Sequence, residues 1–165
     1  MPLLSLQLVV GPSGGWSWLG LLVVASGQAL RLASVGHIGG PSRTRGDSVS
    51  GLVDAGPYAL CRNPLYLGNG LMWLGLGLLS GPGWGLMWAA WMALQYSAIV
   101  RWEEANLVDK LGDAYADYLT RVPRWLPVGE PRPGRWQASR ALRSERSTLV
   151  ALLLVLSLLF ARGWV

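Results

Sequence analysis

Residues 63–100, NPLYLGNGLMWLGLGLLSGPGWGLMWAAWMALQYSAIV, form a long run without a single Asp, Glu, Lys or Arg. The run is too long for one membrane-spanning helix, which needs about 20 apolar residues. It is interrupted by SGPGWG at residues 80–85, and Gly and Pro in such a cluster favour a tight reversal of the chain. We therefore predict a helical hairpin with arms over about 64–79 and 84–100. The glycines of the first arm permit close approach of another helix or of a ligand.

The charges of the chain are concentrated in two segments that flank this hairpin, residues 31–62 and 101–146. Residues 1–30 and 147–161 are as free of charge as the hairpin itself, the mean hydropathy is +0.34, and there are ten tryptophans. This pattern is typical of a membrane protein with polar loops. The hairpin leaves one charged segment and returns to the other, so both must lie on one side of the bilayer. Their arginines predict that this side is the cytoplasm.

Further helices are expected outside the hairpin. Residues 16–33 are long enough to span a bilayer, residues 3–10 read as a partial helix, and residues 138–162 read as a basic interfacial segment followed by a short apolar membrane helix. Residues 101–122 are predicted to continue the hairpin as an amphipathic cytoplasmic helix bent near Gly112, because apolar residues recur there at near-helical spacing. The predicted fold is therefore all-α. It is a single polytopic membrane domain over the whole chain, with about four to five membrane helices and a cofactor pocket.

The composition argues against several other classes of protein. The net charge of +5 does not indicate nucleic acid, because the basic residues flank apolar spans and no basic stripe interleaved with aromatic residues marks a soluble binding face. Cys61 is the only cysteine, which excludes an internal disulfide, and no group of residues has metal-ligand spacing. No basic region precedes the first apolar run, so no cleavable signal peptide is expected. Thirteen arginines against one lysine are typical of a high-GC bacterial genome, and we predict a bacterial inner membrane protein.

Polar side chains gather where the hairpin begins and where it ends. GPYALCRNPLYLG, residues 56–68, leads into the first arm, and RWEEANL, residues 101–107, follows the second. Polar groups at the edge of an apolar span are costly unless something binds them, and the adjacent Glu103 and Glu104 suit a cation. Each feature also has a plain structural explanation. An acidic pair can simply reach for water, Asn63 can cap the helix that starts at residue 64, and the tyrosines can be interfacial residues.

The two motifs together resemble a known family. GPYALCRNPLYLG, followed after the hairpin by EEANLVDKLGDAYADYLTRVPRWLP, resembles the integral-membrane methyltransferases of the isoprenylcysteine carboxyl methyltransferase family and the related phospholipid methyltransferases. The resemblance covers about residues 50–127, which it identifies as a catalytic core. It implies an enzyme that transfers a methyl group from S-adenosylmethionine, at the cytoplasmic ends of the helices, to O, N or S of a lipophilic small molecule or lipid. The cofactor-binding residues that it implies by position are Ser50, Gly51, Leu52, Val53, Tyr58, Arg62, Asn63, Pro64, Leu65, Tyr66, Glu103 and Glu104.

The chain departs from the family pattern at two positions that bear on the substrate. The prenylcysteine enzymes have histidine where this chain has Asn63, which cannot titrate near neutral pH. They also tend to have an arginine one turn before the acidic pair, where this chain has Ile99. Arg101 is offset from that position by two residues and lies on another face of the helix. This second departure weakens the case for a carboxylate substrate.

Glu104, Arg101 and His37 are the candidate catalytic residues. His37, the only histidine, can act as a general base for an amine or thiol, or it can make an ordinary polar contact beside a helix end. Arg43 and Arg45 either bind an anionic head group or belong to a positive-inside loop.

Two other functions are compatible with the sequence. Some sterol reductases share a related region and use a nicotinamide cofactor, but they have many more spans, and the acidic pair suits a cationic donor better than a phosphate-rich one. A non-catalytic membrane protein that binds lipid or assists assembly is the second alternative. It predicts no cofactor binding and no loss of function in Glu103→Gln.

Overall fold

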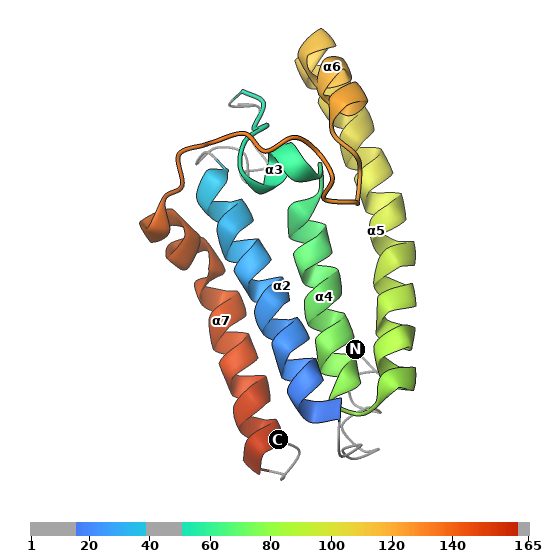
Figure 1. Cartoon of the computed structure of the whole chain (residues 1–165), viewed down its shortest axis with the longest axis vertical. Coiled ribbons are helices and arrows are strands. Elements are labelled where there is room, and N and C mark those ends of the chain that lie inside the picture. The colour runs from blue at the N-terminus through green and yellow to red at the C-terminus, as the bar shows by residue number, and fades with distance from the viewer. Residues whose placement is uncertain (1–15, 39–50, 162–165) are drawn as a thin grey trace. The chain divides into compact units, whose positions relative to one another are not determined.

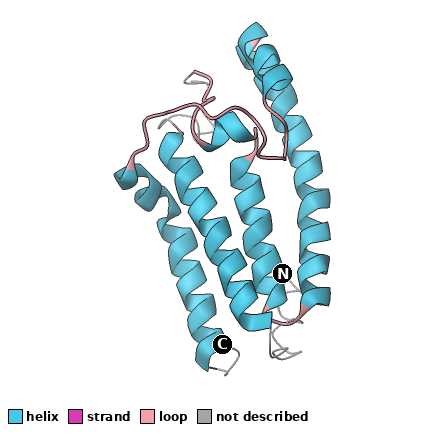
Figure 2. Cartoon of the chain, viewed as in Figure 1, coloured by secondary structure: helices cyan, strands magenta, loops and turns pink. Residues whose placement is uncertain are grey.

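The computed structural model describes residues 16–38 and 51–161, and within them the chain is helical with no strand (Figures 1 and 2). The prediction of an all-α fold is therefore confirmed. The predicted partial helix over 3–10, together with Ser50, Arg43 and Arg45, lies outside the described residues. The helices are α2 Ser17–His37, α3 Pro57–Leu60, α4 Pro64–Leu78, α5 Pro82–Leu111, α6 Asp113–Arg121 and α7 Ala138–Ala161.

Helices α4 and α5 form the predicted hairpin. The turn between them is closed by backbone hydrogen bonds from Ser80 N to Gly77 O and from Gly81 N to Leu78 O, and Gly81 has a positive φ of 124°. Such a backbone conformation is readily available only to glycine. Pro82 then occupies the first position of α5, where its missing N–H costs nothing.

Helix α5 continues well beyond the apolar run that predicts it. It runs without interruption to Leu111, because no glycine or proline occurs between Gly85 and Gly112. Gly112, with φ of 56°, separates α5 from α6, so the predicted bend near this residue is confirmed. The amphipathic helix expected over 101–122 therefore consists of the end of α5 and the nine-residue α6, and its cytoplasmic location stays a prediction.

The structure only partly tests the predicted number of membrane helices. Among the helices in the described ranges, α2 is the one that is long and apolar enough to cross a membrane by length and composition. Helix α4 has 15 residues, fewer than the roughly 20 that a span requires. A bundle of four to five membrane helices thus stays a prediction.

The chain divides into two compact units. Of the described residues, the first comprises 16–29, 68–95 and 146–161. Its core centres on Leu79, against which Leu21, Leu76, Val155 and Leu156 pack. Trp73 of α4 and Trp88 of α5 stack with their ring centroids 4.6 Å apart.

Within this unit, α2 and α4 cross at glycines. A Cβ atom added to Gly20 would lie 2.8 Å from the carbonyl oxygen of Gly75, and one added to Gly27 would lie 2.6 Å from that of Gly68. Backbone therefore contacts backbone at both points, as the glycines of the first hairpin arm led us to expect.

Of the described residues, the second unit comprises 30–38, 51–67 and 96–145, which contain both motifs singled out in the sequence apart from Gly68. Its core is an aromatic cluster of Tyr115 and Tyr118 with the aliphatic Val122 beside them, and Leu52 and Leu107 pack against it. Arg31 of α2 and the fully buried Glu145 of α7 form an ion pair with two charge-assisted hydrogen bonds of 2.8 and 2.9 Å. This pair fixes the start of α7 against the end of α2.

Candidate functional site

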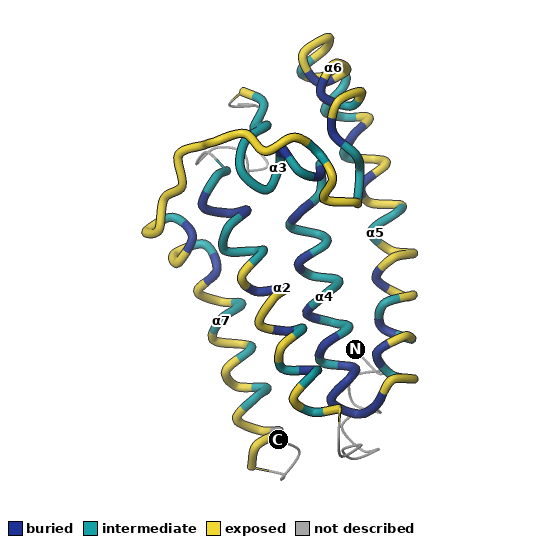
Figure 3. Tube along the Cα trace, viewed as in Figure 1, coloured by how far each residue is buried: buried dark blue, intermediate teal, exposed yellow. Residues whose placement is uncertain are grey.

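Residues 123–137, here termed the strap, hold the first motif in place. The strap has no regular secondary structure and is largely exposed beyond residue 125 (Figure 3). Backbone hydrogen bonds of 2.9 Å attach it to the motif at three points, from Arg62 N to Pro123 O, from Gly129 N to Leu60 O and from Gly56 N to Arg132 O. A Cβ atom at Gly129 would collide with the carbonyl oxygen of Ala59, so the close approach requires glycine.

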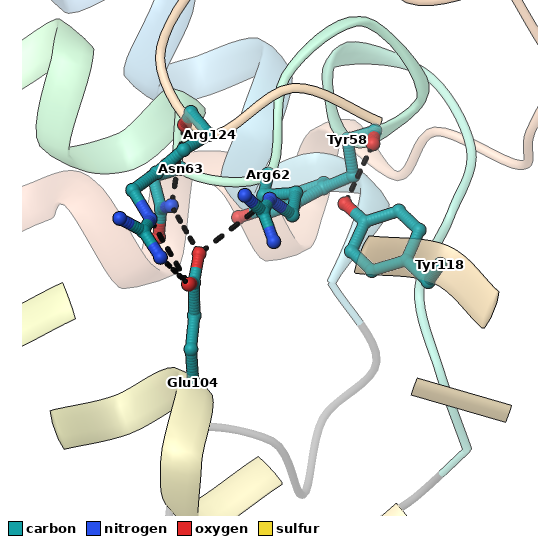
Figure 4. A network of polar contacts seen from close by, with 6 residues as sticks. All are labelled: Tyr58, Arg62, Asn63, Glu104, Tyr118 and Arg124. Carbon is teal, nitrogen blue, oxygen red and sulfur yellow. Dashed lines mark hydrogen bonds and ion pairs between the residues drawn. The ribbon is translucent and has the colours of Figure 1, made fainter. Parts of the chain in front are cut away.

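Glu104 is the centre of a polar network between the two motifs (Figure 4). Only 7% of its side chain is exposed. Arg124 donates from Nε and Nη2 to Oε2 of Glu104, at 3.0 and 2.7 Å. Asn63 donates to Oε1 at 3.3 Å, and Arg62 Nε lies 3.5 Å from the same oxygen. The carboxylate is thus neutralised by two guanidinium groups from segments far apart in the chain.

Asn63 connects three segments through its side-chain amide. Besides Glu104 of α5, its amide nitrogen donates to the backbone carbonyl of Arg124 in the strap at 3.2 Å. Asn63 itself immediately precedes α4. An imidazole has one nitrogen donor or two at separate ring positions, whereas one amide nitrogen carries two donors and can satisfy both acceptors at once.

Glu103 has different neighbours from Glu104. Tyr66 of α4 donates its hydroxyl hydrogen to Oε1 of Glu103 at 2.8 Å, and its ring lies 4.7 Å from that of Tyr96, centroid to centroid. No arginine pairs with Glu103 among the described residues. The half-buried Glu103 therefore carries its negative charge beside two aromatic rings, an arrangement that suits a cation.

Two buried tyrosines of α6 complete the site. Tyr118 donates its hydroxyl hydrogen to the backbone oxygen of Tyr58 at 2.7 Å (Figure 4). Burial raises the pKa of Tyr115 to about 12, and the negative charge of Glu104 acts in the same direction. Burial also raises the pKa of Tyr118 above its usual range. Both phenols are therefore neutral near pH 7, and Tyr118 acts as a hydrogen-bond donor.

The structure brings most of the predicted cofactor-binding residues into the second unit's polar network or its packing. Arg62, Asn63, Tyr66, Glu103 and Glu104 are joined by the contacts above, and Tyr58 is held through its backbone. Leu52 packs on the aromatic cluster, Pro64 is fully buried, and Val53 and Leu65 are half-buried. Gly51 is exposed with open space around it. Their role in binding a cofactor stays a prediction.

Arg101 and His37 stand apart from this network. Arg101 is exposed on α5, and no ion pair joins it to any residue that the structure describes. The ring of His37 lies against Gly56, where it leaves no room for a Cβ atom, and its Nδ1 is 2.7 Å from the carbonyl oxygen of Ala33. His37 therefore contacts the turn before Tyr58 rather than the acidic pair.

Arg124 is the residue that the sequence analysis did not identify. It lies inside the second motif, in VPRWLP, but an arginine in a proline-rich segment looks like any other residue of a positive-inside loop. Its hydrogen bonds to Glu104 become apparent only from the path that the strap takes in the structure.

Comparison with known proteins agrees with the two motifs. The sequence profile described as phospholipid methyltransferase matches residues 16–114. The chain belongs to the phospholipid methyltransferase family. The resemblance seen in the sequence is thereby confirmed, and the family match includes Asn63, Glu103 and Glu104 but ends before Arg124 and the strap.

Three curated relatives illustrate the range of this family. The cobalt-zinc-cadmium resistance protein CzcN of Cupriavidus metallidurans is 34% identical over 113 residues, which are 67% of this chain and 52% of that protein. The phosphatidyl-N-methylethanolamine N-methyltransferase of Saccharomyces cerevisiae is 33% identical over 102 residues, 59% of this chain and 48% of the enzyme. The protein-S-isoprenylcysteine O-methyltransferase of Mus musculus is 32% identical over 119 residues, which are 67% of this chain and 42% of that protein.

The chain thus spans about half the length of the curated relatives that it matches. No solved structure matches it significantly.

Proposed function

We propose that this chain is an S-adenosylmethionine-dependent methyltransferase that acts on a lipophilic small molecule or lipid at the cytoplasmic face of a bacterial inner membrane. One observation carries the proposal. In a member of this family, the NPLY and EE motifs contact each other directly although Asn63 and Glu104 are 41 residues apart. Polar and ionisable groups that gather at the ends of apolar helices are by default the hypothesis for a functional site.

The residues present fit the charges of the cofactor. S-adenosylmethionine carries a sulfonium and an ammonium group, and when bound it supplies an activated methyl group with its own leaving group. Glu103 with the Tyr66 and Tyr96 rings offers a carboxylate and π faces to such cations. The main task of the protein is then to hold the acceptor in line with the methyl group.

We assign Glu104 a positioning part in this site. Its oxygens are already occupied by Arg62, Asn63 and Arg124, so it holds those groups in place rather than accepting a cation itself. Arg101 and His37 stay candidates for contact with the acceptor, Arg101 because it is exposed one helical turn before Glu104.

We infer that the chain crosses the membrane several times, with α2, the α4–α5 hairpin and α7 as membrane helices and both charged segments in the cytoplasm. The arrangement follows the distribution of arginines described above. The acceptor would reach the site from the bilayer and the cofactor from the cytoplasm.

Calorimetric titration of the detergent-purified protein with S-adenosylhomocysteine tests the proposal. We expect micromolar binding that weakens about tenfold or more in Glu103→Gln, because a charge-assisted contact to the ammonium group of S-adenosylhomocysteine is lost. Glu130→Gln is the matched control, since Glu130 is exposed on the strap and the substitution changes the charge by the same amount. Folded protein that binds no cofactor product in detergent or in lipid would contradict the proposal and favour a non-catalytic lipid-binding protein.

A further inference from the structure

The network around Glu104 carries an excess of positive charge. Arg62 and Arg124 both pair with this one carboxylate, at 3.5 Å and 2.7 Å. The neighbouring Glu103 accepts from Tyr66 and forms no ion pair with either arginine in the described part of the chain. The network of Arg62, Arg124 and Glu104, in which Arg62 and Glu104 are buried and Arg124 is partly exposed, therefore has a net charge of +1. An uncompensated charge is costly in such surroundings, and an anion would relieve that cost.

The two guanidinium groups also retain hydrogen-bond donors. A guanidinium has five N–H donors, and Arg124 uses one each from Nε and Nη2, both on Oε2 of Glu104. Its Nη1 makes no hydrogen bond within the described residues. Nε of Arg62 is buried and likewise has no hydrogen-bond partner there. The side chain of Arg62 is 11% exposed and that of Arg124 is 37% exposed, so Arg62 is the buried member of the pair and Arg124 the solvent-facing one.

The position of Arg124 on the strap adds a second argument. The residue lies on the strap, and the strap is fixed to the first motif by hydrogen bonds at Arg62, Leu60 and Gly56. Glu104 then holds the guanidinium through two donors on one oxygen, which orients its plane. An oriented planar fork matches the two oxygens of a carboxylate or phosphate, whereas a flexible surface arginine does not.

We propose that Arg124, oriented by Glu104 and paired with Arg62, is a specificity-determining residue that binds an anionic oxygen group of a ligand. The group is either the carboxylate at the amino-acid end of the cofactor or the phosphate of an acceptor lipid. The inference rests on the proposed methyltransferase function and adds to it an anion-binding residue, Arg124, that lies outside the region matched by the family profile.

Calorimetric titration of the full chain with three ligands tests this site. The ligands are S-adenosylhomocysteine, its decarboxylated analogue that keeps the amine, and dihexanoyl phosphatidic acid in monomeric form. In Arg124→Gln we expect affinity for the ligand whose anion binds here to fall about tenfold or more, while affinity for the decarboxylated analogue is unchanged. Arg132→Gln is the matched control, because Arg132 is also on the strap, is 45% exposed and also pairs with a carboxylate, that of Asp54.

Arg124→Lys keeps the charge and the ion pair with Glu104 but removes the planar fork, so it separates anion binding from stability. We expect it to retain the unfolding temperature of the wild type and to lose several-fold in affinity for the same ligand.

The outcomes are distinct. Selective weakening of S-adenosylhomocysteine assigns the site to the cofactor carboxylate, and selective weakening of phosphatidic acid assigns it to the acceptor phosphate. Equal weakening of S-adenosylhomocysteine and its decarboxylated analogue, or no change for either anionic ligand, overturns the inference while the proposed function stands. If the wild type binds neither cofactor analogue, the proposed function fails, and the phosphatidic acid titration still decides whether Arg124 binds an anion.

Discussion

At the scale of single residues, Glu104 shows why a buried carboxylate and its partners form a unit. Its side chain is 7% exposed, and its two oxygens accept from Arg124 and Asn63 while Arg62 lies within ion-pair distance. Burial of any one of these charges alone would cost several kcal/mol, and their mutual attraction offsets that cost only while all partners are present. Loss of the central carboxylate therefore leaves two arginines facing each other.

Glu104→Gln is expected to lower the free energy of unfolding by about 2–3 kcal/mol, because Arg62 stays buried without its counter-ion. Unfolding of the purified protein in a fixed detergent measures the change. The comparison variant is Asp117→Asn, which removes an i,i+4 pair with Arg121 at 3.0 Å, where the Asp117 side chain is 67% exposed. For that exposed pair we expect a loss of about 0.5 kcal/mol or less. Equal losses in the two variants would show that the Glu104 network is not structurally important.

At the scale of secondary-structure elements, the contact between α2 and α4 depends on glycine rather than on large apolar side chains. An added Cβ at Gly75 would lie 2.7 Å from the carbonyl oxygen of Gly20 and 2.7 Å from the backbone nitrogen of Val24. Backbone atoms cannot rotate away as a side chain does, so the helices would have to separate. Gly70, on the same helix, has open space around its Cα.

This difference predicts opposite effects of the same substitution. Gly75→Ala should lower the free energy of unfolding by about 1–3 kcal/mol through overpacking. Gly70→Ala should leave stability unchanged or raise it by up to about 1 kcal/mol, because alanine restricts the unfolded chain and favours the helix. Thermal unfolding of both variants in one detergent measures the contrast. Stabilisation of both variants would contradict the close backbone contact between α2 and α4 at Gly75.

At the scale of the whole molecule, the distribution of charge predicts how the chain crosses the membrane. The turn at Gly83 joins two uncharged arms, whereas the strap belongs to an arginine-rich segment. The positive-inside rule therefore places Gly83 on the far side of the membrane from Val128.

Single cysteines test this arrangement. In a Cys61→Ala background, Gly83→Cys should react with a membrane-impermeant thiol reagent from outside intact cells, and Val128→Cys should react only in inverted vesicles. Both sites tolerate the change, because a Cβ at Gly83 meets nothing within 4 Å and Val128 is 75% exposed. The background variant without cysteine controls for non-specific labelling. Reaction of both cysteines from the same side would rule out a spanning α4–α5 hairpin.

Local signals in the sequence determine the helices and the meeting of the two motifs. Charge-free runs, the Gly–Pro cluster at residues 80–85 and the lone Gly112 act over a few residues, and they correctly predict the hairpin and the bend. The proximity of the two motifs follows from them, because the start of one arm and the end of the other must lie side by side. The length of α5 is also predicted, since the near-helical spacing of apolar residues continues past residue 100 and Gly112 is the first glycine or proline after Gly85.

Only the tertiary structure decides which partners the site residues take. The sequence identifies Glu103 and Glu104 as an acidic pair, yet neighbouring positions on a helix face different directions, and one meets Tyr66 while the other meets two arginines. Arg124 reaches Glu104 because a strap without regular structure is held by hydrogen bonds to distant backbone and by close contact at Gly129. Such contacts join residues far apart in the chain, and no local periodicity in the sequence predicts them.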